Sequence, residues 1–172
     1  MQKLIGGLLV LTATAGAGYV YGREMKLYLE RLLYLRYVLS LIKGEIGYTH
    51  APLPEVLAQV AKRVREPYRL WLNKTAREIR MREETSFART WSRCVDKYLK
   101  ALDLKYEHVI LIKEPGTFLG SLEADTLDQT MQLYLNRMDL ETEKLREGLA
   151  AKIRISRCLG VMSGIFFIVI LL

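Results

Sequence analysis

Histidine and cysteine are the side chains most often used for nucleophilic, acid–base and metal chemistry, and this chain has two of each. The histidines are His50 and His108, and neither stands in a His-Glu-x-x-His arrangement. Cys94 and Cys158 are 64 positions apart and form no spaced metal-binding pair. No glycine-rich loop joins an expected strand to a helix. We therefore expect no enzymatic activity, no bound metal and no cofactor.

Two carboxylates are candidates for a buried functional group. Glu45 and Asp125 both fall on expected helices, and a carboxylate that faces water is the usual explanation at such positions. We therefore assign neither of them a catalytic role.

A dense run of positive charge between positions 62 and 82 is the second chemical feature. It contains Lys62, Arg63, Arg65, Arg69, Lys74, Arg77, Arg80 and Arg82 against two acidic residues. Within a chain of formal net charge +7, such a run fits an acidic protein, anionic lipid or nucleic acid. We predict a partner-binding patch made of Arg63, Arg65, Arg69, Arg77 and Arg80.

Aromatic side chains interleaved with this charge could stack on nucleic-acid bases. Tyr68 and Trp71, however, fall on the apolar face of the expected helix. We therefore predict that both lie in the core and that the arginines form a solvated face.

The elements that must position these residues are helices. Apolar residues recur at spacings of three and four throughout the middle of the chain, and no stretch alternates for long with a period of two. The expected helices run from about 23 to 48, 54 to 64, 67 to 79, 86 to 102, 103 to 112, and from 121 onward. Asp103 and Ser121 are predicted helix caps, and residues 114–116 a turn. This pattern predicts an all-α fold, an antiparallel bundle of about six helices.

Both ends of the chain are apolar. Leu4 to Gly22 carries no charged side chain and would span roughly 28 Å as a helix, whereas Cys158 to Leu172 would span roughly 22 Å. We predict transmembrane helices over residues 1–22 and 158–172, continuous with the first and last helices of a bundle over residues 23–157. Lysines and arginines flank both segments on the bundle side, which predicts a cytoplasmic bundle.

Two alternatives remain open for these ends. The first segment also fits a cleaved secretory signal peptide, because Lys3 precedes an apolar run and small residues follow it at Ala13 to Ala17. The last segment could instead be a buried core helix, because it is short for a full span.

Small residues on the two terminal segments suggest close helix packing. Thr14, Gly18 and Gly22 share one face of the first segment, and Gly160 and Gly164 form a G-x-x-x-G pattern on the last. The hypothesis is an antiparallel hairpin in which Gly18 lies near Gly160 or Gly164. The alternative is that glycine is simply common in membrane helices.

Two internal segments and the frame of the chain resemble a known family. Residues 45–53 (Glu-Ile-Gly-Tyr-Thr-His-Ala-Pro-Leu) and residues 118–129 resemble the stage III sporulation protein AB family of endospore-forming bacteria. The Lys-Leu-Ile-Gly-Gly start and the Ile-Leu-Leu end are similar as well. The positions that carry the motif are Glu45, Tyr48, Pro52, Leu53, Gly120, Asp125 and Gln129.

The resemblance implies a non-enzymatic membrane platform in a secretion-like channel complex between mother cell and forespore. It also implies a central domain similar to the inner-membrane platform protein of type II secretion and type IV pilus systems. The expected partners are a secretion-type ATPase, other membrane proteins of the complex, and lipid, in the mother-cell membrane that faces the forespore. No nucleic acid is expected, and a homo-oligomer is left open. The alternative function is a membrane-tethered module that binds nucleic acid or anionic lipid through residues 62–82.

Overall fold

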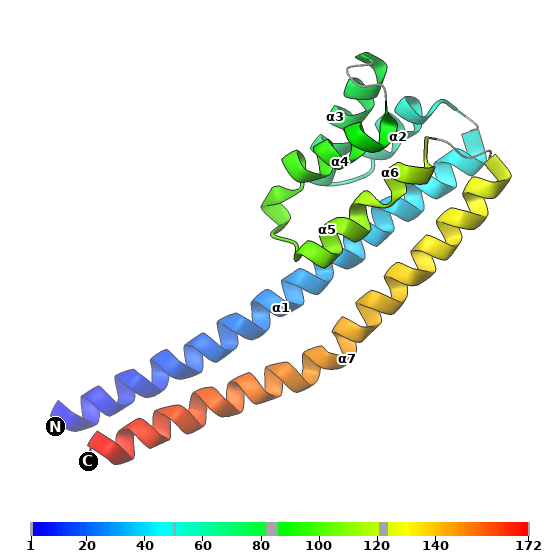
Figure 1. Cartoon of the computed structure of the whole chain (residues 1–172). Coiled ribbons are helices and arrows are strands. Elements are labelled where there is room, and N and C mark those ends of the chain that lie inside the picture. Colours follow the sequence, from blue (N-terminus) through cyan, green and yellow to red (C-terminus); the bar gives the residue numbers. More distant parts are fainter. Residues whose placement is uncertain (1, 50, 82–85, 121–123, 172) are drawn as a thin grey trace. The chain divides into compact units, whose positions relative to one another are not determined.

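The computed structural model describes residues 2–49, 51–81, 86–120 and 124–171, and these residues form helices joined by short connections (Figure 1). The elements are α1 (Gln2–Thr49), α2 (Leu53–Ala61), α3 (Tyr68–Met81), α4 (Phe87–Tyr98), the 3₁₀ helix η1 (Lys100–Leu102), α5 (Tyr106–Lys113), α6 (Pro115–Phe118) and α7 (Ala124–Leu171). No strand occurs in these ranges. The all-α fold class is therefore confirmed.

The chain divides into two compact units. Unit 1 comprises Met1–Glu30 with Glu141–Leu172, and unit 2 comprises Arg31–Leu140. The long helices α1 and α7 contribute to both units. The two units are defined by contacts between residues, whereas the predicted domain borders at 22/23 and 157/158 were defined by where the apolar segments end. Those borders therefore stay a prediction.

The core of unit 2 contains the predicted apolar stripes of α1 and α7. On α1 it includes Leu32, Leu35, Leu39 and Ile42, and on α7 Leu127, Met131, Leu135 and Met138; each of these side chains is at most 7% exposed. Ion pairs join Arg36 to Asp139 at 2.8 Å and Lys43 to Asp128 at 3.0 Å. Because the later residue on α1 meets the earlier one on α7, the two segments run antiparallel (Figure 1).

The shorter helices of unit 2 close around two tryptophans. Trp71 of α3 and Trp91 of α4 are fully buried, and their rings meet edge to face with centroids 4.8 Å apart. The Trp91 indole N–H donates to the carbonyl of Ile112 at 2.9 Å, which ties α4 to α5.

Three local predictions are corrected by the structure. Of the turn expected at residues 114–116, only Glu114 lies in a turn, because α6 begins at Pro115 and Gly116 packs directly against Trp91. Asp103 does not cap α5: it lies in the left-handed region with φ 48°, and the extended Lys105 precedes the helix instead. The helix expected to reach Leu102 ends at Tyr98 and continues as η1.

The terminal spans predicted from hydropathy are not confirmed. Across the residues that the structure describes, no helix is long and apolar enough to cross a membrane. Ser121, the predicted cap of the last helix, lies outside the described residues.

Candidate functional site

The predicted partner-binding patch lies on the solvent side of α3 and on the connection that leads into it. Arg69, Arg77 and Arg80 are exposed, whereas Tyr68 and Trp71 are 2% and 0% exposed on the opposite face of the helix. The prediction that these two aromatic residues are core is therefore confirmed. Neither ring is available to stack on a nucleic-acid base.

The first three arginines of the patch make contacts within unit 2. Arg63 pairs with the buried carboxylate of Glu45 at 3.3 Å. The Arg65 guanidinium lies 4.4 Å from the centre of the Tyr34 ring, and Arg69 donates to the carbonyl of Val64 at 3.1 Å. These contacts hold the connection between α2 and α3, so a structural role accounts for these three of the five arginines.

Arg77 and Arg80 differ from those three arginines. Both side chains are exposed on α3, and neither has an ion-pair partner among the described residues. A guanidinium in water keeps its full set of five donors available to a carboxylate or phosphate.

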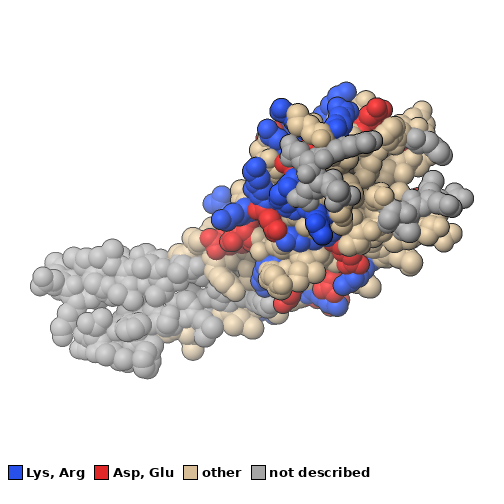
Figure 2. Space-filling view, turned by 45° about the horizontal axis from the view of Figure 1, so that its top comes forward, with Lys and Arg blue, Asp and Glu red and all other residues tan. Residues whose placement is uncertain are grey.

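Helix α4 adds basic residues that the sequence analysis did not assign to the patch. Arg89, Arg93 and Lys97 are exposed and follow one another at intervals of four. That interval places them along one side of the helix, and it could have been recognised in the sequence. We call Arg77, Arg80, Arg89, Arg93 and Lys97 the basic surface. Figure 2 shows lysine and arginine side chains gathered over this part of unit 2.

Glu78 joins α3 to the row of cations on α4. Its carboxylate accepts hydrogen bonds from Arg93 at 2.8 Å and from the Cys94 thiol at 3.2 Å, with the Tyr98 hydroxyl at 3.5 Å. Burial opposes ionisation, but the hydrogen bonds from Arg93 and Cys94 and the charges of Arg93 and Lys97 outweigh it, so the pKa of Glu78 is lowered. Glu78 therefore stays ionised at neutral pH and orients part of the basic surface.

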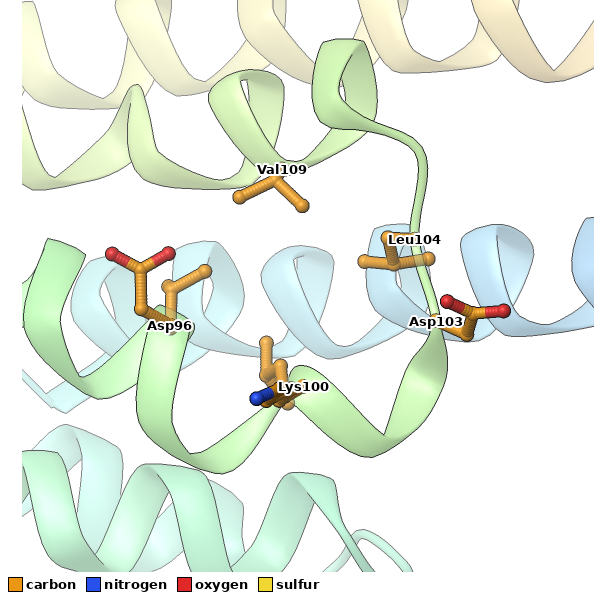
Figure 3. A pocket seen from close by; sticks show the side chains of 7 residues that line it. Asp96, Lys100, Asp103, Leu104 and Val109 are labelled. Carbon is orange, nitrogen blue, oxygen red and sulfur yellow. The ribbon is translucent and has the colours of Figure 1, made fainter.

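A cavity of about 180 Å³ opens between α4, η1 and α5 (Figure 3). Its lining consists of Val95, Asp96, Leu99, Lys100, Asp103, Leu104 and Val109. The Asp96 carboxylate is already paired with Lys113 at 2.7 Å. The lining thus combines apolar side chains with a mixed charged rim and holds no histidine or cysteine, and it gives no catalytic arrangement.

The residues that carry the family motif lie mainly where α1 ends, α2 begins and α7 begins. Glu45 is buried, Tyr48 is 87% exposed, Pro52 and Leu53 open α2, and Gln129 is exposed on α7. The Lys43–Asp128 ion pair places the end of α1 beside the start of α7. The side chain of Asp125 lies outside the described part of the structure.

Gly120, the remaining motif position, marks a close approach between the end of α6 and α4. A Cβ at this position would lie 2.8 Å from the Cβ of Phe87. A side chain there would displace Phe87, so the glycine has a packing reason.

The thiol of Cys94 is poorly suited to nucleophilic chemistry. It is buried, and desolvation raises its pKa from the usual 9.0 to about 11. His108 is also buried, whereas His50 is not among the described residues. Within the described ranges, no group of three or more His, Cys, Asp or Glu side chains is placed to hold a metal.

Of the five predicted membrane-packing positions, Gly22 is the one whose surroundings are described. A Cβ there would lie 3.4 Å from the side chain of Ile153, so α1 and α7 approach closely within unit 1. The side-chain surroundings of Thr14, Gly18, Gly160 and Gly164 lie outside what the structure describes, and their pairing stays a prediction.

Comparison with known proteins gives one consistent family. The sequence model described as stage III sporulation protein AB matches residues 3–172. The stage III sporulation protein AB of Bacillus subtilis (strain 168) is 24% identical over 176 residues, covering all of both chains. A solved structure of a stage III sporulation protein AB has a TM-score of 0.58 at 20% identity, covering 74% of this chain and 94% of that one. At this identity, the structural likeness supports the fold.

Proposed function

This chain belongs to the stage III sporulation protein AB family, and on that premise we propose that it is a non-enzymatic platform protein of a sporulation channel complex. The platform is attached to the mother-cell membrane that faces the forespore, with unit 2 in the cytoplasm. It resembles a secretion-system platform in that it binds a secretion-type ATPase, which supplies the energy that the platform lacks.

Membrane attachment is supported by the sequence of the two ends. Residues 4–22 and 158–172 carry no charged side chain, and basic residues follow the first segment and precede the second. This charge asymmetry favours a cytoplasmic position for the intervening residues. Protease added outside intact cells should leave unit 2 uncut, whereas digestion from outside would contradict this orientation.

The single observation that supports partner binding best is the basic surface. Its arginines Arg77, Arg80 and Arg89 are exposed without an ion-pair partner among the described residues, unlike Arg63, which is committed to Glu45. Arginine forks bind carboxylates bidentately, so the matching surface on the ATPase would be acidic.

Co-purification of the full chain with the ATPase tests this proposal. R77E/R80E replaces two exposed guanidiniums by carboxylates and is expected to weaken ATPase binding by about tenfold or more, since a loss of about 1.4 kcal/mol in binding free energy is tenfold in affinity. K144E/R146E is the matched control, because it makes the same change in net charge at exposed residues of unit 1. Equal loss in both variants, or no loss in R77E/R80E, would remove the basic surface as the docking site.

The alternative, binding of nucleic acid or anionic lipid through residues 62–82, is distinguished by the same variants. A nucleic-acid surface would bind DNA with an affinity that falls steeply with salt and that R77E/R80E abolishes. We expect no such binding, since Tyr68 and Trp71 are buried.

A further inference from the structure

The contact between Gly22 and Ile153 sets the register of α1 and α7 in unit 1. The two segments belong to one compact unit, and α1 begins at the end of that unit where α7 ends (Figure 1). Each residue of a helix advances about 1.5 Å along the axis. A residue of α1 that precedes Gly22 by a given number of positions therefore lies at the same height along the helix pair as the residue of α7 that follows Ile153 by that number, to within about two residues. The register therefore relates residues that are more than 100 positions apart in the sequence.

This register brings cations from both helices together. Arg23 directly follows Gly22, and Arg154 directly follows Ile153. When two right-handed helices run antiparallel and touch at one residue each, the residue that follows the contact points to the same side of the helix pair on both helices. Arg23 and Arg154 are both exposed, so two guanidiniums lie level on one side of unit 1.

Two further side chains of α1 extend the same side. Tyr19, Arg23 and Lys26 follow at intervals of four and three, and Tyr19 and Lys26 are exposed as well. Among the described residues, no ion-pair partner occupies Arg23, Lys26 or Arg154; the ion pairs of unit 1 join Lys144 to Glu141 and Arg146 to Glu143. The like charges are therefore available to an external anion.

Tyrosines lie next to these cations on the side of the chain ends. Tyr19 and Tyr21 are 62% and 52% exposed, and the uncharged part of α1 precedes them in the sequence. Exposed tyrosines between an apolar segment and basic residues are typical of the level of lipid headgroups, because the ring is apolar and the hydroxyl is polar.

We propose that Arg23, Lys26 and Arg154, with Tyr19 beside them, form a site for the phosphate of anionic phospholipid headgroups at the membrane surface. This inference rests on the proposed membrane attachment. It places the headgroup level near Tyr19 and Tyr21, and it separates lipid recognition on unit 1 from protein recognition by the basic surface of unit 2. Guanidinium groups bind phosphate oxygens bidentately through their planar set of N–H donors.

The test uses the full chain in detergent with an equimolar mixture of phosphatidylcholine and phosphatidylglycerol, and native mass spectrometry to count bound lipids. The wild-type protein should retain phosphatidylglycerol in preference to phosphatidylcholine. Each cation near an anionic surface changes lipid partition by about fivefold, so R23Q/K26Q/R154Q should lose at least fivefold of that preference. R77Q/R80Q/R89Q is the matched control, because it removes the same charge from unit 2 and should keep the preference.

If R23Q/K26Q/R154Q keeps the preference while circular dichroism shows an unchanged helical content, the site is overturned. If R77Q/R80Q/R89Q loses it instead, the lipid binds the basic surface and the proposal is also wrong. Carbonate extraction of membranes separates the two claims: a protein that stays in the membrane without headgroup preference contradicts the site alone, whereas a protein released by carbonate contradicts membrane attachment and the site together.

Discussion

The guanidinium of Arg63 lies 3.3 Å from the carboxylate of Glu45, which is buried near the end of α1. This pair joins a motif position of the family to a residue of the predicted patch, and it holds the connection after α2 against α1. Because Glu45 is buried and Arg63 supplies its ion pair, Arg63 has a structural reason to be basic.

Removal of this arginine should therefore cost stability. Arg63→Ala leaves a buried carboxylate without its ion-pair partner and is expected to lower the free energy of unfolding by about 1–2 kcal/mol in urea titrations. Arg77→Ala removes an exposed arginine and should change it by less than about 0.5 kcal/mol. Equal effects of the two substitutions would show that the pair does not stabilise the fold.

Gly116 is predicted to be required for packing between α6 and α4. A Cβ at this position would lie 2.8 Å from Cδ1 of the fully buried Trp91, so Gly116→Ala should lower the free energy of unfolding by about 1–3 kcal/mol. Gly44→Ala is the control, since nothing lies within 4 Å of a Cβ there. Within a helix it should raise stability by about 0.5 kcal/mol. The measurement is thermal or urea unfolding, and a neutral Gly116→Ala would contradict the packing.

Glu78 is predicted to make stability depend on acidic pH. Its pKa in the folded protein is lower than the usual 4.5, so its contribution is fully present above pH 4.5 and is lost as the pH falls through the folded-state value. Glu78→Gln should therefore destabilise the protein at pH 7 by about 1–2 kcal/mol, and the difference from wild type should shrink below pH 4.5. Glu66→Gln, at an exposed carboxylate, is the control. A difference that persists unchanged to pH 3 would exclude this role of Glu78.

The Cys94 thiol should be unreactive in the folded protein. Its pKa is raised to about 11 by burial, so the thiolate fraction at pH 7 is on the order of 10⁻⁴. In a Cys158→Ser background, which removes the exposed cysteine, iodoacetamide should label Cys94 only after urea unfolds unit 2. Stoichiometric labelling under native conditions would mean that α3 and α4 open readily around this residue.

Cysteine crosslinking can test the register of the terminal segments. Thr14 precedes Gly22 by eight residues, so it lies level with residue 161, next to Gly160; Gly18 lies level with residue 157. Continued from the Gly22–Ile153 contact, this register predicts that Thr14 lies nearer the level of Gly160 than Gly18 does. In a chain without native cysteines, T14C/G160C should crosslink more efficiently than G18C/G164C, whose levels differ by about 11 Å. The reverse order would contradict the register.

Two kinds of feature were readable from the sequence. The helices and their buried stripes follow from spacing along a single element: Trp71 and Leu72 had to face the core because the charged residues of α3 occupy the other side. The family was recognisable for a similar reason, because the residues that resemble it fall in two short segments, 45–53 and 118–129. These features depend on neighbours in the chain, and a helical period of 3.6 residues converts them directly into faces.

Pairing between elements was decided by the tertiary structure. Sequence neighbours do not indicate that Arg36 forms an ion pair with Asp139 or that Arg63 forms one with Glu45. Nor do they indicate that Glu78 accepts hydrogen bonds from Arg93 and Cys94. Charged side chains occur on every helix, so the choice of partner depends on which helices become neighbours and in what register. Residues 115–118 form the short helix α6, where a turn was expected over 114–116, for the same reason, since Gly116 allows the backbone to approach Trp91. Spacing therefore determined which face of each helix is buried, whereas the packing of helices against one another decided which charges remain free to bind a partner.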